Sequence, residues 1–403
     1  MMTHAPLSPP QRVLRVLLSA LCTTALLACA ASPPPGETVR VATLNIAMGL
    51  DNEGELAARL AAGDDPALQD LAAVLQTVRP DIVLLNEVDF QPGVDAAGLL
   101  RRHYLQIPRE GRQAIDYPYS FSAPVNTGVP SGLDIDGNGT VGGPGDAWGF
   151  GRFPGQYGML VLSKYPLQTN QLRSFQLFPW SAMPGAQRPR QPDGSAFYPD
   201  EVWSRLRLSS KNHWDLPVRL PGGQVVHLLI SHPTPPVFDG PEDRNGRRNH
   251  DEIRLWLDYV SPDPAGAYLV DDQGRSGGLP PGARWLVMGD LNADPVDGDG
   301  RPGPIRALLD PALSNQDCVP ASEGAVEAAR LQGGVNSQQQ GDPALDTSDF
   351  NDRNSGNMRV DFVLPSRSLA VTGCGVFWPA AGQPGHQWLG FTDHRLVWVD
   401  IAP

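Results

Sequence analysis

Polar side chains of a few chemical types follow several apolar, strand-like runs of this 403-residue sequence. They are Asn45, Glu87, His232, Asp290, Asn292, Asp361, Asp393 and His394. Carboxylates, amides and imidazoles at one edge of a sheet would converge on one pocket, a set that suits a hard divalent cation beside titratable bases. Taken singly, an Asp after a strand is most often a turn former and a lone His is more often structural. The combination therefore carries the prediction.

The order of these short motifs resembles the endonuclease/exonuclease/phosphatase superfamily, with its deoxyribonuclease I-like fold. Along the chain they read Thr-Leu-Asn-Ile, Asn-Glu-Val, Tyr-Gly-Met-Leu-Val-Leu-Ser-Lys-Tyr-Pro-Leu, Ser-His, Gly-Asp-Leu-Asn, Arg-Val-Asp-Phe and Thr-Asp-His. The resemblance covers roughly residues 38–402. It implies an α/β fold, a four-layered sandwich of two mixed β-sheets packed face to face with flanking helices. It also implies metal-dependent hydrolysis of phosphate esters.

The resemblance assigns a Mg²⁺ or Mn²⁺ ion to Glu87, with Asn45 beside it. It places the carboxylate of Asp393 close enough to share in binding this metal. A divalent ion there would neutralise charge on the phosphoryl oxygens, which is one requirement of phosphate ester hydrolysis.

The resemblance gives the remaining polar residues roles in attack on the phosphate. Asp290 and Asn292 would hold the attacking water, with Asp290 as its base, and their spacing of two would put both side chains on one face of an extended segment. His394 would contact the scissile phosphate while Asp361 orients its ring. His232 matches a second histidine that acts as an acid or a phosphate ligand in nuclease members.

The elements that must position these residues begin with a β-branched, alternating strand at 38–46. Asp65 and Pro66 then predict a helix start, since Asp caps helices and Pro favours the first helical position. The helix ends at Pro80 and leads into an apolar strand at 81–87. Strand, helix and strand in this order predict a parallel crossover unit.

Further strands are predicted at 157–162, 216–220, 225–231, 285–289, 358–364 and 396–401. One more helix is predicted at 251–260. Long loops at 91–156, 170–212, 261–283 and 310–357 should gather around one end of the sheets. No repeat or change of composition marks a second domain.

Composition excludes several classes of protein. With 43 Gly, 41 Pro and 41% apolar residues, the chain is loop-rich but able to bury a core, so collagen and full disorder are excluded. The net charge of -13 argues against a nucleic-acid coat protein, although a nuclease that holds phosphate through metal remains open. No P-loop occurs, and the Gly-Asn-His run of another metal-phosphoesterase class is absent.

The first 28 residues are predicted to be a bacterial lipoprotein signal peptide, with an apolar run and no acidic residue. They end in Leu-Leu-Ala-Cys, which resembles a lipobox and predicts lipidation of Cys29. An ordinary signal cut after Ala28 or Ala30 is the alternative. Residues 29–37 would be a tether and 38–403 the folded domain. The expected location is the bacterial cell envelope, periplasmic or at the surface, with the membrane as a partner through the lipid anchor.

Export to an oxidising compartment leaves Cys318 and Cys374 as the pair available for a disulfide, with two buried thiols as the alternative.

A loop that begins like an EF-hand is a candidate structural Ca²⁺ site. Asp134, Asp136 and Asn138 occupy its first, third and fifth positions. Its twelfth position is Gly145 instead of Glu, although Asp146 follows, and a plain Asp/Gly turn is the alternative.

Lys211 and His213 precede a strand and could point toward a substrate, or belong to a surface loop. The sequence as a whole predicts a divalent-metal phosphodiesterase or phosphatase of the envelope. An extracellular nuclease of the same fold and a non-catalytic surface-binding lipoprotein are the alternatives. Nucleic acid would enter only as substrate, and nothing in the sequence specifies an oligomer.

Overall fold

A computed structural model of the chain describes residues 1–2 and 38–402. The predicted signal peptide, the lipidation site at Cys29 and the tether therefore lie outside the described residues, apart from the first two residues of the chain. Within the described part of the chain, no helix is both long enough and apolar enough to cross a membrane.

Two mixed sheets form the centre of the fold. The first has the strand order β12 (Ala370–Phe377), β13 (Leu396–Ala402), β1 (Val39–Met48), β2 (Ile82–Val88), β4 (Met159–Ser163) and β3 (Tyr119–Phe121). The second has the order β11 (Asp361–Pro365), β8 (Trp285–Asp290), β7 (Val225–Ser231), β6 (His213–Arg219) and β5 (Arg173–Ser174). The pairs β1–β2 and β7–β8 are parallel, and the other neighbours are antiparallel. The short strands β9 (Ser348–Asp349) and β10 (Asn357–Met358) pair separately.

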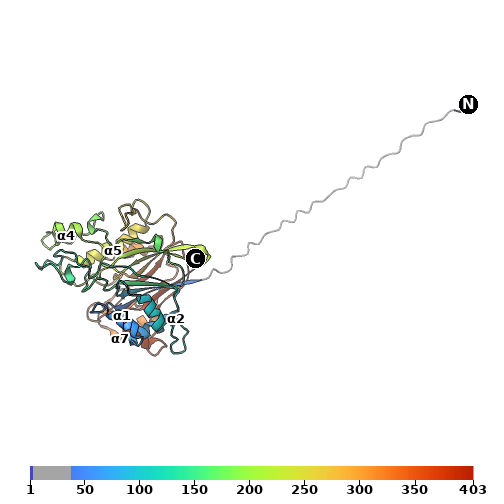
Figure 1. Cartoon of the computed structure of the whole chain (residues 1–403), viewed down its shortest axis with the longest axis horizontal. Coiled ribbons are helices and arrows are strands. Elements are labelled where there is room, and N and C mark those ends of the chain that lie inside the picture. The colour runs from blue at the N-terminus through green and yellow to red at the C-terminus, as the bar shows by residue number, and fades with distance from the viewer. Residues whose placement is uncertain (3–37, 403) are drawn as a thin grey trace. The chain divides into compact units, whose positions relative to one another are not determined.

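The sheets pack face to face because their strands are apolar on both sides. In β2, Ile82 and Leu84 face the second sheet, whereas Val83 and Leu85 face the helices, as the two-residue period of a strand requires. The helices α1 (Glu55–Ala62), α2 (Pro66–Val78) and α3 (Ala96–Leu100) cover the outer side of the first sheet. Helix α5 (Arg244–Val260) covers the second sheet, and Figure 1 shows it on the opposite side from α1 and α2. The predicted four-layered sandwich is confirmed.

The predicted crossover from β1 to β2 is confirmed in detail. The side chain of Asp65 accepts a hydrogen bond from the backbone N–H of Leu68, and Pro66 occupies the first turn of α2. The buried face of α2 includes Leu68, Leu71 and Leu75, whose spacing places them on one side of the helix. This packing sets β1 and β2 side by side, so that Asn45 pairs with Asn86 in the parallel register.

Several predicted boundaries were wrong. The helix expected at 251–260 begins at Arg244. Polar residues of its first turns are buried, and hydrogen bonds compensate for their burial. Asn249, for example, is fully buried and donates to the carbonyls of Thr234 and Leu291. The strand expected at 358–364 is divided between β10 and β11, which pair with different partners.

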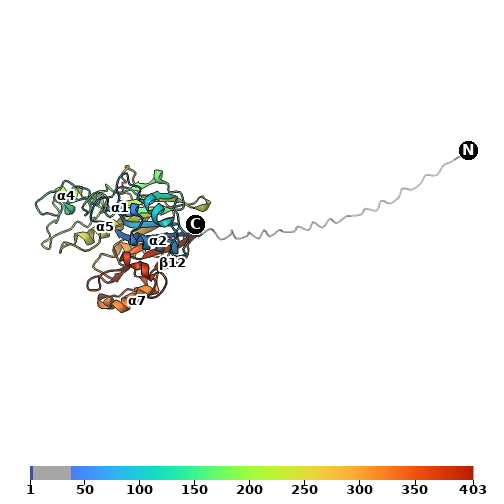
Figure 2. The same ribbon diagram turned by 60° about the horizontal axis from the view of Figure 1, so that its bottom comes forward.

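The connections expected to be loops also contain regular structure. The 91–156 connection includes α3 and β3, the 170–212 connection includes β5 and α4 (Asp200–Arg205), and the chain also forms α6 (Gly303–Leu308) and α7 (Glu323–Gln332). Figure 2 shows α7 on the β12 side of the domain. Ala325 of α7 packs in the core with Trp378, just beyond β12. The predicted disulfide between Cys318 and Cys374 is present, with the two Cα atoms 6.0 Å apart. It links the 310–357 connection to β12.

Candidate active site

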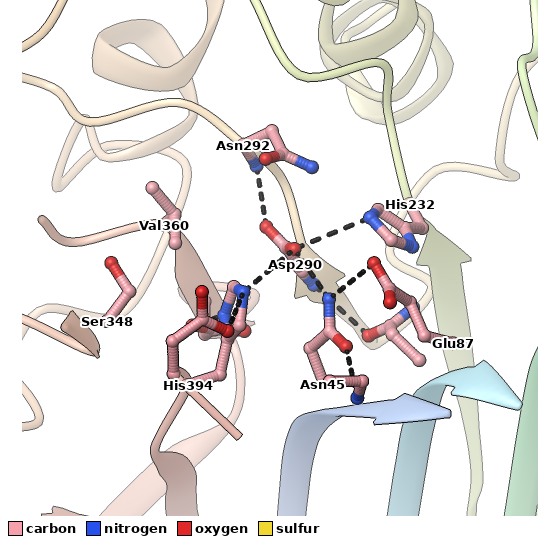
Figure 3. Close-up of polar contacts among 12 residues, drawn as sticks. Asn45, Glu87, His232, Asp290, Asn292, Ser348, Val360 and His394 are labelled. Carbon is pink, nitrogen blue, oxygen red and sulfur yellow. Dashed lines mark hydrogen bonds and ion pairs between the residues drawn. The ribbon is translucent and has the colours of Figure 1, made fainter. Parts of the chain in front are cut away.

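Polar side chains from both sheets meet at one edge of the sandwich. Asn45 and Glu87 come from β1 and β2 of the first sheet, whereas His232 and Asp290 come from the ends of β7 and β8 in the second. His394 enters on the loop that precedes β13. Figure 3 shows these residues surrounding the carboxylate of Asp290. The structure therefore brings together residues separated by up to 349 positions, since 394 - 45 = 349.

Backbone irregularities aim these side chains into the site. The pairing of β1 with β2 shifts register after Asn45, where Ala47 has a φ of 51°. Glu87 has a φ of 60° and Asn292 a φ of 50°, conformations that side chains other than Gly rarely adopt. Bulges and left-handed residues of this kind gather at functional sites, where they re-aim side chains.

Asp290 is the hub of the site. It is 1% exposed, and its Oδ2 accepts a hydrogen bond from Asn45 Nδ2 at 3.1 Å. His232 Nε2 lies 3.4 Å from the same oxygen, and His394 Nε2 lies 3.7 Å from it. The other oxygen, Oδ1, accepts the backbone N–H of Asn292 at 2.9 Å.

These partners keep Asp290 ionised. Burial alone would raise the pKa of its carboxyl, because a charge is poorly solvated inside a protein. The charge of His394 and the hydrogen bonds from His232 and Asn45 outweigh burial, so the pKa of Asp290 lies well below its ordinary value. A carboxylate at the centre of the site is therefore negatively charged at neutral pH.

His394 and Asp361 form the predicted carboxylate–imidazole pair. Nδ1 of His394 lies 2.9 Å from Asp361 Oδ2, and both side chains are buried. Burial opposes a charge on the imidazole, but Asp361 and Asp290 raise the pKa of His394 above its ordinary value. Thr347 Oγ1 also donates to Asp361 at 3.0 Å, which fixes the carboxylate that orients the ring. The ring therefore holds Nδ1 toward Asp361 and leaves Nε2 on the side of Asp290.

Ligand atoms of Asp290, Asp361 and His394 lie within 4.8 Å of one another, a spacing that would also admit a cation. A metal ligand must offer a lone pair, however, and the raised pKa of His394 keeps both of its ring nitrogens protonated, with Nδ1 held by Asp361. We therefore interpret this group as a hydrogen-bonded relay, and Glu87 stays the predicted metal ligand.

The carboxylate of Glu87 is only partly engaged by other side chains. Among the described residues, it accepts one hydrogen bond, from Asn45 Nδ2 to Oε1 at 3.2 Å. Oδ1 of Asn45 accepts the backbone N–H of Ala47 at 3.0 Å, which turns the amide nitrogen toward the site. The amide nitrogen of Asn45 thus positions Glu87, while its Oδ1 keeps one acceptor site, and a metal contact of Asn45 stays a prediction. A carboxylate with a free oxygen fits Mg²⁺, which is commonly held by one or two carboxylates, water and substrate phosphate.

Two predicted residues occupy less central positions. The carboxylate of Asp393 is 52% exposed and lies 3.8 Å from His394 Nε2. The expected extended segment from Asp290 to Asn292 is wrong, because the backbone turns into the left-handed region at Asn292. The Asn292 amide donates to the carbonyl of Pro233 at 3.2 Å, so it ties the two strand-end loops together.

Lys211 and His213 lie in the interior and not in a surface loop. His213 is fully buried between Ser209 and the carbonyl of Glu252, and burial lowers its pKa to about 4. It is therefore a neutral structural residue. Lys211 is 6% exposed, and burial lowers its pKa while the carboxylates of Glu252, Glu87 and Asp290 oppose that change. Lys211 is thus a buried amine within the electrostatic reach of the site.

The candidate calcium loop folds back on Asp146. Ligand oxygens of Asp134, Asp136 and Asp146 lie within 4.8 Å of one another. The amide of Asn138 donates to Asp136, and its side-chain oxygen accepts the backbone N–H of Thr140. Asp146 is buried and already accepts backbone N–H groups from the loop. A Ca²⁺ ion at these carboxylates stays a prediction.

Comparison with solved structures places this architecture among known folds. A structure described as endonuclease/exonuclease/phosphatase from Beutenbergia cavernae DSM 12333 aligns with a TM-score of 0.50 at 16% identity, covering 91% of this chain and 71% of that one. A structure described as endonuclease/exonuclease/phosphatase family protein from Leptotrichia buccalis C-1013-b aligns with a TM-score of 0.44 at 14% identity, covering 90% of this chain and 99% of that one. A truncated TDP2 from Caenorhabditis elegans aligns with a TM-score of 0.41 at 15% identity, covering 91% and 98%.

No curated protein matches this sequence. The profile of the Endonuclease/Exonuclease/phosphatase family, in contrast, matches residues 42–394, a range that begins within β1 and ends at His394. Because this match spans most of the chain and every residue of the described site, the chain belongs to the endonuclease/exonuclease/phosphatase family.

Proposed function

We propose that the protein is a divalent-metal-dependent hydrolase of phosphate esters, acting in the bacterial envelope as a phosphodiesterase or phosphatase. Membership of the family supports a hydrolase-like activity on phosphate esters, nucleic acids included. The single observation that carries the proposal is the arrangement around Asp290, where an ionised carboxylate faces two imidazoles beside the free oxygen of Glu87.

In this proposal Asp290 orients the attacking water. Its Oδ2 is crowded by Asn45, His232 and His394, whereas Oδ1 accepts one N–H and keeps an acceptor site. A carboxylate of such low pKa is a weak base, so it takes the proton only as attack on phosphorus makes the water acidic. Orientation is therefore its main contribution.

His394 binds and neutralises a phosphoryl oxygen. Its raised pKa keeps the ring charged at neutral pH, and its Nε2 is free to donate because Nδ1 is held by Asp361. His232 offers a second imidazole, whose Nδ1 is buried and has no hydrogen-bond partner among the described residues. A hydrogen bond from the His394 ring, which Asp361 holds in place, would stabilise the developing charge and lower the barrier, since a preorganised donor needs no rearrangement during the reaction.

Glu87 would hold the Mg²⁺ or Mn²⁺ ion, and Asp393 is close enough to the rim of the site to assist. The bound ion would stabilise negative charge on the phosphate and its leaving oxygen. The need for a cation is electrostatic. Glu87, Asp290, Asp361 and Asp393 bring four carboxylates to one edge, and a phosphate ester adds further negative charge.

The substrate class is tested with a panel assayed in Mg²⁺, Mn²⁺ and Ca²⁺. The panel contains plasmid DNA, RNA, inositol phosphates, phospholipids, nucleotides and bis(p-nitrophenyl) phosphate. We expect hydrolysis of small diesters or monoesters to exceed cleavage of DNA and RNA, because the chain carries a net charge of -13. Preferential cleavage of plasmid DNA would favour the nuclease alternative. Metal-independent binding without turnover would favour the non-catalytic lipoprotein.

The envelope location rests on the lipobox-like sequence that ends at Cys29. Labelling of cells with a radioactive fatty acid tests it directly. We expect the wild-type chain to incorporate label and Cys29→Ala to lose it. Equal labelling of both chains, or labelling of neither, would contradict lipidation at this position.

A further inference from the structure

The strand β9 and its neighbour Thr347 lie across both members of the His394–Asp361 pair. Thr347 Oγ1 donates to Asp361 Oδ2 at 3.0 Å and accepts the backbone N–H groups of Val360 and Asp361. One residue later, Ser348 forms an isolated bridge with His394. A single short segment of the 310–357 connection therefore contacts the carboxylate through one residue and the imidazole-bearing backbone through the next.

A buried guanidinium holds this segment against the loop that carries His394. Arg395 is 5% exposed, and one of its terminal nitrogens donates to Asp349 at 2.9 Å. The other terminal nitrogen donates to the carbonyls of Thr392 and His394, both at 2.9 Å. The guanidinium carbon also lies 4.5 Å from the centre of the Trp378 ring. Only the planar fork of Arg reaches a carboxylate and two carbonyls at once, since the ammonium of Lys is a point charge.

Backbone hydrogen bonds complete the connection. The backbone N–H of Arg395 donates to the carbonyl of Thr347, and the backbone N–H of Asp349 donates to the carbonyl of Asp393, each at 2.7 Å. The next residue, Phe350, packs edge-on against the His394 ring with the centroids 5.3 Å apart. The ring is thus bounded by Asp361 on one side and by this segment on another.

We propose that Arg395 and Asp349 form a latch that positions the His394 imidazole over Asp290, so that both are positioning residues for the reaction. This inference rests on the proposed function only for its catalytic consequence. The geometric part concerns the hydrogen bond from His394 to Asp361 and holds whatever the substrate is. A loosened latch would let the loop at 392–395 drift, and displacement of a reacting group by about 1 Å lowers turnover by about 100-fold.

The test compares Arg395→Gln, Arg395→Lys and Asp349→Ala in the full chain. We expect Arg395→Gln to lower kcat on bis(p-nitrophenyl) phosphate by about 10- to 100-fold with KM changed less than about twofold, as outer supports of catalytic groups do. Arg395→Lys should restore part of kcat, because it keeps the charge but not the fork. The matched control is Arg367→Gln, which removes an exposed ion pair with Asp317 and should leave both constants unchanged.

A second readout needs no turnover. Because His394 Nδ1 donates to Asp361 at 2.9 Å, we expect its proton to give a downfield imidazole resonance in a proton NMR spectrum, assigned by its loss in His394→Gln. We expect this resonance to broaden or disappear in Arg395→Gln and in Asp349→Ala, which is 27% exposed in its side chain and therefore tolerates truncation. An unchanged resonance together with unchanged kcat in both folded variants would overturn the latch. If the wild type hydrolyses no ester, the proposed function fails, while the resonance still decides the latch.

Discussion

Replacing Asp346 by Asn should stabilise the protein at neutral pH. Asp346 is 7% exposed, and among the described residues its carboxylate makes no hydrogen bond or ion pair. Burial, followed by repulsion from Asp294, Asp297 and Asp342, raises its pKa from 3.8 to about 8. The residue directly precedes Thr347, which holds the carboxylate of Asp361. The buried carboxyl of Asp346, which destabilises the fold when it is ionised, therefore lies next to the residues that hold the His394–Asp361 pair.

The size of the effect follows from proton linkage. The folded state holds its proton more tightly than the unfolded state, so this contribution to stability is complete below pH 3.8 and is lost as the pH rises toward 8. Each pH unit in that window is worth about 1.4 kcal/mol. Between pH 5 and pH 7 the free energy of unfolding of the wild type should therefore fall by about 3 kcal/mol. The variant should not show this fall, since the amide that replaces the carboxyl does not titrate.

Urea unfolding of the wild type and Asp346→Asn at pH 5 and pH 7, in EDTA, measures this difference. We expect the stabilisation of the variant to grow by about 3 kcal/mol over the two units. Asp299→Asn is the matched control, because it removes an exposed carboxylate from the same region and should give no growth. Equal effects of Asp346→Asn at the two pH values would refute the reasoning, since a carboxylate that ionises normally gives no pH dependence in this range.

Three further predictions concern other parts of the fold. Glu87→Gln should raise the Mg²⁺ concentration needed for half-maximal activity by about 10- to 100-fold, measured by metal titration of turnover, and an unchanged requirement would place the metal elsewhere. Joint replacement of Cys318 and Cys374 by Ser should lower the free energy of unfolding by about 4 kcal/mol in urea, because the bridge closes a loop with a sequence separation of 56, and no loss would contradict this. Ca²⁺ at 100 times its dissociation constant should stabilise the wild type by about 3 kcal/mol in thermal unfolding, but it should not stabilise Asp146→Asn. Equal shifts of the two proteins would exclude a Ca²⁺ site at Asp134, Asp136 and Asp146.

The strand ends were the most predictable part of the molecule. Asn45, His232 and Asp290 each follow an apolar run, and strands that share a sheet edge bring such residues together. The period of the strands and the cap at Asp65 are local signals, so the crossover from β1 to β2 could be predicted from the sequence. The prediction that these side chains converge is confirmed by the contacts around Asp290.

The features that could not be predicted from the sequence depend on contacts between distant residues or on bends of the backbone. The left-handed conformation of Glu87 has no local signal, because the surrounding fold imposes it. Helix α7 is weakly amphipathic, and β12 contains two glycines, so neither has the apolar period that identifies buried elements. Arg395 follows the Thr-Asp-His motif directly, yet its partner Asp349 is 46 residues earlier, since 395 - 349 = 46, and no pattern connects them.

The most direct measurement is the turnover of bis(p-nitrophenyl) phosphate by the wild type and by Asp290→Asn, with EDTA and after addition of Mg²⁺ or Mn²⁺. We predict that EDTA abolishes wild-type turnover, that either metal restores it, and that Asp290→Asn stays at least about 100-fold slower at saturating metal. Turnover of the wild type that ignores EDTA, or an Asp290→Asn variant as fast as the wild type, would contradict this prediction.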